Sequence, residues 1–296
     1  MNSICEANNS TASVSDYWQL LKPRVMALVV FTSFCGLYMA PGHIHPLLEL
    51  TAILSIALAS GAAGCLNMWY ERDRDKQMIR TMNRPTASGV IHSDSALAFG
   101  IILSALAIIL MQLAVGTFPA LLLILTIGFY IGIYTIILKP TTPQNIVIGG
   151  IAGALPPVIG WSIVAPLDFK PWSLFLIIML WTPAHFWALA INHAKEYKDA
   201  GLPMMPNIVG VKNTKKLIII YTFLTIVSAI IPYILNMVGS IYLFFSTILG
   251  VVFIYLSIKL YQSDDQKDGL KVFAYSILYL FIVFTLLISD KQVTHG

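Results

Sequence analysis

The stretch NMWYERDRDKQMIRTMNRPTASG, residues 67–89, separates two long apolar runs and concentrates charge in a chain that otherwise has little of it. Three of its oxygen-bearing side chains, Asn67, Glu71 and Asp75, stand four residues apart. At about 100° per residue, a helix carries these three on one stripe, whereas Asp73 points to the other side. Amide and carboxylate oxygens in a row suit a hard cation such as Mg²⁺, which usually binds through one or two carboxylates, waters and a substrate phosphate. The stretch therefore predicts a helix with a metal-binding face; the alternative is a solvated helix end in a basic loop.

Three basic residues of the same stretch, Lys76, Arg80 and Arg84, repeat the four-residue spacing. A helix that continued this far would place these cations beyond the metal face, where they could bind phosphate. They could equally be topology signals or contacts for anionic lipid, so the spacing alone leaves both interpretations open.

Composition identifies an integral membrane protein. Of the 296 residues, 57% are hydrophobic and 11% charged, and the mean hydropathy is +0.79, which excludes an ordinary soluble chain. Short polar or Pro/Gly segments divide the apolar residues into runs long enough to span a bilayer. The sequence predicts an all-α, polytopic membrane bundle of nine transmembrane helices. The predicted spans are 25–41, 47–70, 94–114, 118–138, 145–165, 172–194, 217–237, 239–261 and 270–289.

The ends of the chain and its charges set the expected domain organisation and orientation. Residues 1–16 are rich in Ser and Asn and lack an apolar core segment, so we expect a disordered cytosolic tail and no cleaved signal peptide. Residues 17–296 form one membrane domain. With the N-terminus in the cytoplasm, every lysine and arginine except Lys170 and Lys291 falls on the cytoplasmic side, which is a strong positive-inside bias.

A second charged loop, around KEYKDAGLPMMP at 195–206, follows the sixth predicted helix as 71–93 follows the second. Glu196 and Asp199 are three residues apart and therefore neighbours on a helical face. Two acidic motifs on the same side of the membrane can hold two metals, and a diphosphate bound between them would become a good leaving group. This predicts allylic ionisation and prenyl transfer, with the isoprenoid tail in the apolar bundle interior.

Four stretches carry a resemblance to a known family: LLKPRVMALVVFTSFCG (20–36), residues 67–89, YTIILKPTTPQNIVIGGIAGALPPVIGW (134–161) and WTPAHFWALAINHAKEYKDAGLPMMP (181–206). Together they resemble the UbiA-type superfamily of intramembrane prenyltransferases. The resemblance implies nine helices around a central cavity and Mg²⁺-dependent transfer of farnesyl from farnesyl diphosphate to a vinyl group of haem B, in haem O and haem A biosynthesis. It also implies a cell inner membrane location, with haem A synthase or terminal oxidase assembly factors as partners and no nucleic acid.

The resemblance also assigns site residues. As metal ligands and catalytic groups it implies Asn67, Glu71, Asp75 and Glu196. Asp199 lies outside the family pattern and joins this set only through its spacing to Glu196. As contacts of the diphosphate it implies Arg80, Arg84, Lys139, Arg24, Lys198 and Tyr197. Three positions depart from the family pattern. The family usually has Asp where this chain has Glu71 and Glu196, and each extra methylene moves the carboxylate by more than an ångström. The family also commonly has a basic residue after Lys139, where this chain has Pro140.

His185 is a further catalytic candidate, since ionisable residues inside a membrane bundle are functional by default. It could contact haem or act as an acid or base near the vinyl group. The alternative is a neutral histidine hydrogen-bonded to a neighbouring helix.

Two rival functions remain open from the sequence. A related prenyltransferase acting on an aromatic quinone precursor would share the acidic motifs. A membrane transporter would place its carboxylates near the bilayer centre, whereas here they cluster at one face.

Overall fold

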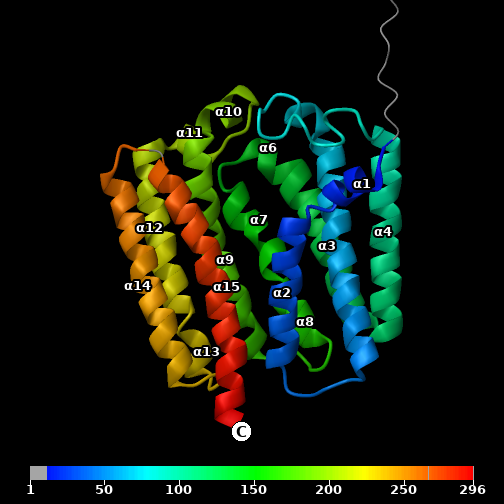
Figure 1. The fold of residues 1–296 in the computed structure, drawn as a ribbon, viewed down its shortest axis with the longest axis vertical. Helices are drawn as coiled ribbons and strands as arrows, with labels where there is room; N and C mark the ends of the chain where they lie inside the picture. Colours follow the sequence, from blue (N-terminus) through cyan, green and yellow to red (C-terminus); the bar gives the residue numbers. More distant parts are fainter. Residues whose placement is uncertain (1–11, 266, 296) are drawn as a thin grey trace, which may run out of the picture.

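The computed structural model describes residues 12–265 and 267–295, with side chains up to Lys291, and every regular element in that part of the chain is helical (Figure 1). The elements are α1 (Val14–Leu20), α2 (Pro23–Met39), α3 (Pro46–Asp75), α4 (Ser93–Ala114), α5 (Thr117–Gly128), η1 (Phe129–Leu138), α6 (Lys139–Thr141), α7 (Asn145–Ala154), α8 (Pro156–Ser162), α9 (Phe169–Asn192), α10 (Ala194–Asp199), α11 (Met205–Ile208), α12 (Val211–Ser228), α13 (Ile231–Ile234), α14 (Ser240–Gln262) and α15 (Lys267–His295).

Eight helical segments of the described chain are long and apolar enough to cross a membrane, and a ninth is obtained if α1 and α2, bent by 55°, count as one span. All nine predicted spans have a counterpart, so the predicted fold class is confirmed. The largest difference in the first half is α3, which runs five residues past the predicted 47–70 and carries Glu71 and Asp75.

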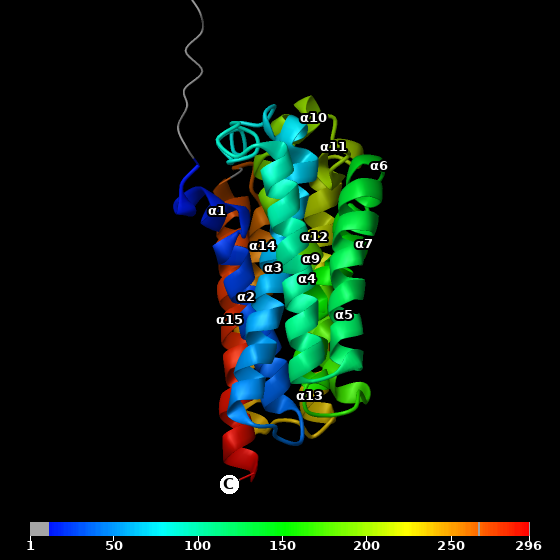
Figure 2. The same cartoon turned by 90° about the vertical axis from the view of Figure 1, so that its right-hand side faces the viewer.

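The helices run roughly along the long axis in both views (Figures 1 and 2). The short elements α1, α10 and α11 and the turns of residues 76–92 lie at one end, and the C-terminus lies at the other (Figure 1). The two charged loops, far apart in sequence, are therefore neighbours at the same end. The first three residues of α1 belong to the tail expected for 1–16, so that part is helical, with Ser13 and Asp16 forming a capping box; residues 1–11 lie outside the described part.

Glycine and proline explain the close contact between α2 and α8. A Cβ at Gly36 would lie 2.0 Å from the carbonyl oxygen of Pro157, and one at Gly160 would lie 1.9 Å from that of Ser33. Only glycine allows these backbones to approach so closely. Leu155 separates α7 from α8, and Pro156 begins α8, since proline lacks the backbone N–H that would continue the preceding helix.

The bundle is not uniformly packed. A large apolar core lies among α9, α12, α14 and α15 and extends to α2, α7 and α8, with Trp187, Phe253, Tyr279 and Phe284 essentially inaccessible to solvent. The helices of the first half share a smaller core, which includes Ile56, and also border a cavity. The cavity therefore belongs to the N-terminal half of the bundle and is not enclosed by all nine spans.

Candidate active site

The predicted stripe of three oxygen-bearing residues lies on one buried face of α3. Asn67, Glu71 and Asp75 are 2%, 3% and 1% exposed, whereas Asp73 is exposed on the other side of the helix. We refer to Asn67, Glu71 and Asp75 as the oxygen ladder. Because its side chains are shielded from solvent, a solvated helix end does not describe it, and charges there are weakly screened.

Both carboxylates of the ladder bind a basic side chain from elsewhere. Lys139, at the start of α6, donates a hydrogen bond of 2.6 Å from Nζ to Oε2 of Glu71. Arg84 donates from one guanidinium nitrogen to both carboxylate oxygens of Asp75, at 3.0 and 2.8 Å. Two of the predicted phosphate-binding cations thus lie in direct contact with the predicted metal ligands.

The amide of Asn67 is held from two sides. Lys22, in the bend between α1 and α2, donates from Nζ to Oδ1 of Asn67 at 2.6 Å, and Nδ2 of Asn67 donates to Oγ1 of Thr135 at 3.0 Å. Thr135 belongs to η1, a π-helix that is followed directly by Lys139. Such wide helical turns are rare and often occur at functional sites. Each of the three ladder residues therefore accepts a hydrogen bond from one basic side chain.

The helix does not continue to Arg84, so helical spacing does not place the three basic residues beside the ladder. α3 ends at Asp75, where Oγ1 of Thr81 donates to the carbonyl oxygen of Asp75 at 3.0 Å. Lys76 turns outward and pairs with Asp73 at 3.2 Å. The turns reverse the chain, and this reversal, not helical periodicity, returns Arg84 to the ladder.

The second acidic motif meets the first at Arg80. The backbone N–H of Arg80 donates to Oε2 of Glu196 at 3.5 Å, and its guanidinium donates to the Tyr197 hydroxyl at 3.4 Å. His193 Nδ1 lies 3.0 Å from Oε1 of Glu196, and this hydrogen bond is the main cause that lowers the pKa of the Glu196 carboxyl. Asp199 and its neighbour at 198 are exposed.

The two motifs do not merge into one acidic cluster: within residues 12–265 and 267–291, no three His, Cys, Asp or Glu side chains gather as a metal site. The ladder by itself nevertheless offers amide and carboxylate oxygens, the donors that Mg²⁺ prefers. Their oxygens are bound by cations of this chain, so a metal there would compete with these cations.

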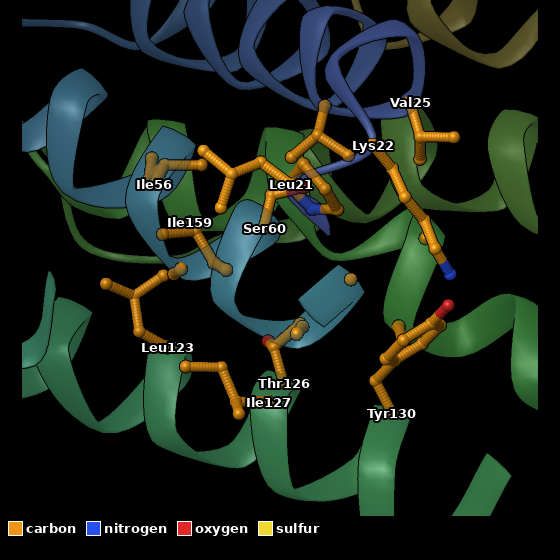
Figure 3. A pocket seen from close by; sticks show the side chains of 17 residues that line it. Leu21, Lys22, Val25, Ile56, Ser60, Leu123, Thr126, Ile127, Tyr130 and Ile159 are labelled. Atoms are coloured by element: carbon orange, nitrogen blue, oxygen red, sulfur yellow. The ribbon is translucent and has the colours of Figure 1, made fainter. Parts of the chain in front are cut away.

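Next to the ladder lies an apolar cavity of about 130 Å³ (Figure 3). Side chains from α3 and α5, such as Ile56 and Leu123, form much of its wall. Figure 3 shows the amine of Lys22 and the hydroxyl of Tyr130 pointing toward one another at one end. Lys22 therefore belongs to both regions, since its stem lines the cavity and its amine binds Asn67 of the ladder.

Lys22 and Thr135 are the ladder contacts that the sequence did not single out. Lys22 counted only as one of the basic residues on the predicted cytoplasmic side, although it lies within the matched stretch 20–36. Its neighbour Arg24, which was singled out, is exposed. No periodicity marks Thr135, because the π-helical turn that positions it departs from 3.6 residues per turn.

His185 lies away from the ladder, in the interface between α9 and α15. Its ring stacks between those of Trp181 and Phe273, at centroid distances of 4.3 and 4.4 Å, and Nδ1 lies 2.7 Å from Oγ of Ser276. It does not line the cavity described above. These contacts match the alternative interpretation, in which the histidine is hydrogen-bonded to a neighbouring helix.

A multi-pass helical membrane protein with a buried polar ladder beside an apolar cavity is the architecture of an intramembrane enzyme that binds an amphiphilic substrate. The profile of the UbiA prenyltransferase family matches residues 29–285. A protein from Agrobacterium fabrum named protoheme IX farnesyltransferase is 49% identical over 286 residues, which cover 95% of this chain and 90% of that protein.

Solved structures of the same fold agree with this match. A UbiA homolog from Aeropyrum pernix K1 has a TM-score of 0.74 at 14% identity, covering 93% of this chain and 98% of that one. A UbiA homolog from Archaeoglobus fulgidus bound to GPP and Mg²⁺ has a TM-score of 0.60 at 17% identity, covering 93% and 99%. The chain belongs to the UbiA prenyltransferase family and is a multi-pass membrane prenyltransferase.

Proposed function

We propose that this chain transfers a farnesyl group from farnesyl diphosphate to a vinyl group of haem B, giving haem O and diphosphate. The observation that carries the proposal is the junction at Lys22, where the charged ladder adjoins the apolar cavity. A prenyl diphosphate has the same two parts, a charged head and a hydrocarbon chain. The printed name of the relative from Agrobacterium fabrum, 49% identical to this chain, supports farnesyl as the donor group and haem as the acceptor.

We infer Mg²⁺ as the cofactor, with Asn67, Glu71 and Asp75 as ligands in the first motif and Glu196 as a ligand in the second. The oxygen donors of the ladder and the Mg²⁺ named with the Archaeoglobus fulgidus homolog support this assignment. When bound, the metal would neutralise charge on the diphosphate. Asp199 is exposed on α10 and is the weakest member of the predicted ligand set.

Basic side chains at the same end would bind the diphosphate. Arg84 and Lys139 already lie beside the ladder, and Arg80 connects the two loops. Guanidinium groups suit phosphate because they donate two parallel hydrogen bonds. Tyr197 is positioned by Arg80. Arg24 and Lys198 are exposed and would act as outer contacts.

The reaction starts when the bond between C1 of the farnesyl group and the diphosphate oxygen breaks, and the electron pair leaves with diphosphate. Arg84 and Lys139 stabilise the negative charge that develops on the leaving group. The apolar cavity excludes water from the allylic cation. The π electrons of the vinyl group then form the new C–C bond and leave a cation on the carbon next to the macrocycle. Water adds there and loses a proton, which gives a hydroxyethylfarnesyl substituent.

The positive-inside bias supports a cell inner membrane protein with its N-terminus and ladder facing the cytoplasm. Farnesyl diphosphate is charged and would reach the ladder from that side. Haem A synthase or oxidase assembly factors are the partners expected to take the product.

A product assay tests the function. The purified protein is incubated with farnesyl diphosphate and haem B, with Mg²⁺ or with a chelator, and parallel reactions receive an aromatic quinone precursor as the acceptor. We expect a farnesylated, hydrated haem by mass spectrometry, formed only with the metal. A prenylated aromatic product without a haem product would support the rival acceptor, and transport of a solute without consumption of farnesyl diphosphate would support a transporter.

A further inference from the structure

The ladder and its partners carry more positive than negative charge. Glu71 and Asp75 supply two carboxylates, and Lys22, Lys139 and Arg84 supply three cations. Each cation donates to a ladder oxygen within 3.0 Å. The site as folded is therefore a set of internal salt bridges and charge-assisted hydrogen bonds, and its formal charges add to one positive charge in excess.

A metal and these cations need the same oxygen atoms. For a metal to coordinate Glu71, the amine of Lys139 must give up part of its contact with that carboxylate. Adding two positive charges to a site that already has a positive excess, in a region of weak screening, is electrostatically unfavourable. Mg²⁺ alone should therefore bind the ladder weakly.

A diphosphate changes this balance. It brings roughly three negative charges and several oxygen acceptors, so the displaced amines and guanidinium find new partners. The metal and the diphosphate together nearly cancel the excess, because two positive charges and about three negative charges sum to about one negative charge. Lys22 also lines the cavity, so its amine would then lie where the charged head of the substrate meets its hydrocarbon chain.

We propose that Lys22, Lys139 and Arg84 are exchangeable counterions that move from the ladder to the diphosphate, so that metal and diphosphate each strengthen the binding of the other. The proposal rests on the proposed use of this site for a prenyl diphosphate and adds how the site is regulated: the metal-binding oxygens become available only when the phosphate takes their cations. The coupling is reciprocal, since linkage requires the same factor in both directions.

Binding measurements without any acceptor test this exchange. Mg²⁺ is titrated by calorimetry into the purified full-length protein, with and without farnesyl thiodiphosphate, an analogue that reacts too slowly to turn over. We expect the Mg²⁺ affinity to rise by at least about tenfold with the analogue, and the analogue affinity to rise by the same factor with Mg²⁺. Equal Mg²⁺ affinities in the two titrations would overturn the proposal.

Removal of one counterion should change the affinities for Mg²⁺ and for the analogue in opposite directions. In Lys139→Met, Glu71 loses its competitor, so we expect Mg²⁺ alone to bind about tenfold more tightly and the analogue without metal to bind about tenfold more weakly. If Lys139 only supported the fold, its substitution would weaken the binding of both Mg²⁺ and the analogue. Lys76→Met is the matched control, because Lys76 loses the same charge from the same end of the protein but pairs with exposed Asp73; it should change neither affinity.

A second variant is measured where the first does not fold. If Lys139→Met does not fold, as judged by thermal unfolding, Lys22→Met is measured in its place and should show the same opposite signs. Weaker Mg²⁺ binding in a folded variant would overturn the exchange. The outcomes also separate this exchange from the proposed function. Coupled binding without a haem product would refute only haem as the acceptor. A haem product together with tight binding of Mg²⁺ alone would refute only the exchange.

Discussion

The two acidic motifs look alike in sequence but differ in the folded protein. Glu71 lies on a helix of 30 residues, with a side chain 3% exposed and bonded to Lys139. Glu196 lies on a helix of six residues, with a side chain 27% exposed and bonded to His193. A charge in the first motif interacts through a medium of low effective dielectric, whereas solvent and salt screen the second. Similar spacing therefore does not imply similar electrostatic strength, and the ladder should dominate binding and catalysis.

Removal of a ladder carboxylate is the strongest test of this difference. Asp75→Ala deletes a group 1% exposed that binds Arg84 through both oxygens. We expect prenyl transfer to fall by at least about 10²–10³-fold, as for loss of a preorganised electrostatic group. Asp75→Asn keeps the shape and should fall nearly as far, because the charge is what the site needs. Product formation at saturating substrate measures both variants.

The control for that experiment lies two residues away. Asp73 has the same side chain on the exposed face of α3, where it pairs with Arg72 and Lys76. Asp73→Ala should keep activity within about twofold, since exposed ion pairs contribute little. An equal loss in Asp73→Ala and Asp75→Ala would mean that the buried face of α3 has no special role.

The spans and the stripe on α3 could be predicted because each depends on local regularity. Apolar runs of sufficient length predict membrane helices, and a four-residue spacing predicts one face. These features were confirmed because no distant contact is needed to specify them.

The partners of the stripe could not be predicted, because they come from segments separated by tens of residues and from irregular backbone. Lys22 reaches Asn67 from a bend with φ of +52°, which is uncommon for a residue other than glycine. Arg84 returns through turns, not through a longer helix. A sequence pattern identified the groups that carry charge, but pairing of those groups depends on tertiary packing.

The second motif should give a smaller effect than the ladder. Glu196→Gln keeps the hydrogen-bond acceptor for Arg80 and removes a partly solvated charge, so we expect a loss of about tenfold, consistent with one charge-assisted interaction. Asp199→Asn, at an exposed position on the same short helix, should lose less than Glu196→Gln. Steady-state rates at several Mg²⁺ concentrations measure this order. A Glu196→Gln loss as large as that of Asp75→Ala would remove the distinction between the two motifs.

The smallest expected effect concerns the pH dependence of the second motif. The hydrogen bond from His193, followed by weaker contributions such as the backbone N–H of Arg80, lowers the pKa of Glu196 below its ordinary value despite some desolvation. A carboxyl with a lowered pKa in the folded protein stabilises it above the unfolded pKa, and that contribution is lost as the pH falls through the folded pKa.

His193→Gln removes the main cause of this shift, so the pKa of Glu196 should rise and its carboxylate should protonate at a higher pH. The acid limb of the activity profile should therefore move in the alkaline direction, while activity near neutral pH stays almost unchanged. The same substitution made in the Glu196→Gln protein supplies the control, because no carboxyl remains there to titrate. A shift of equal size in both backgrounds would assign the acid limb to another group, and the ladder carboxylates would be the next to test.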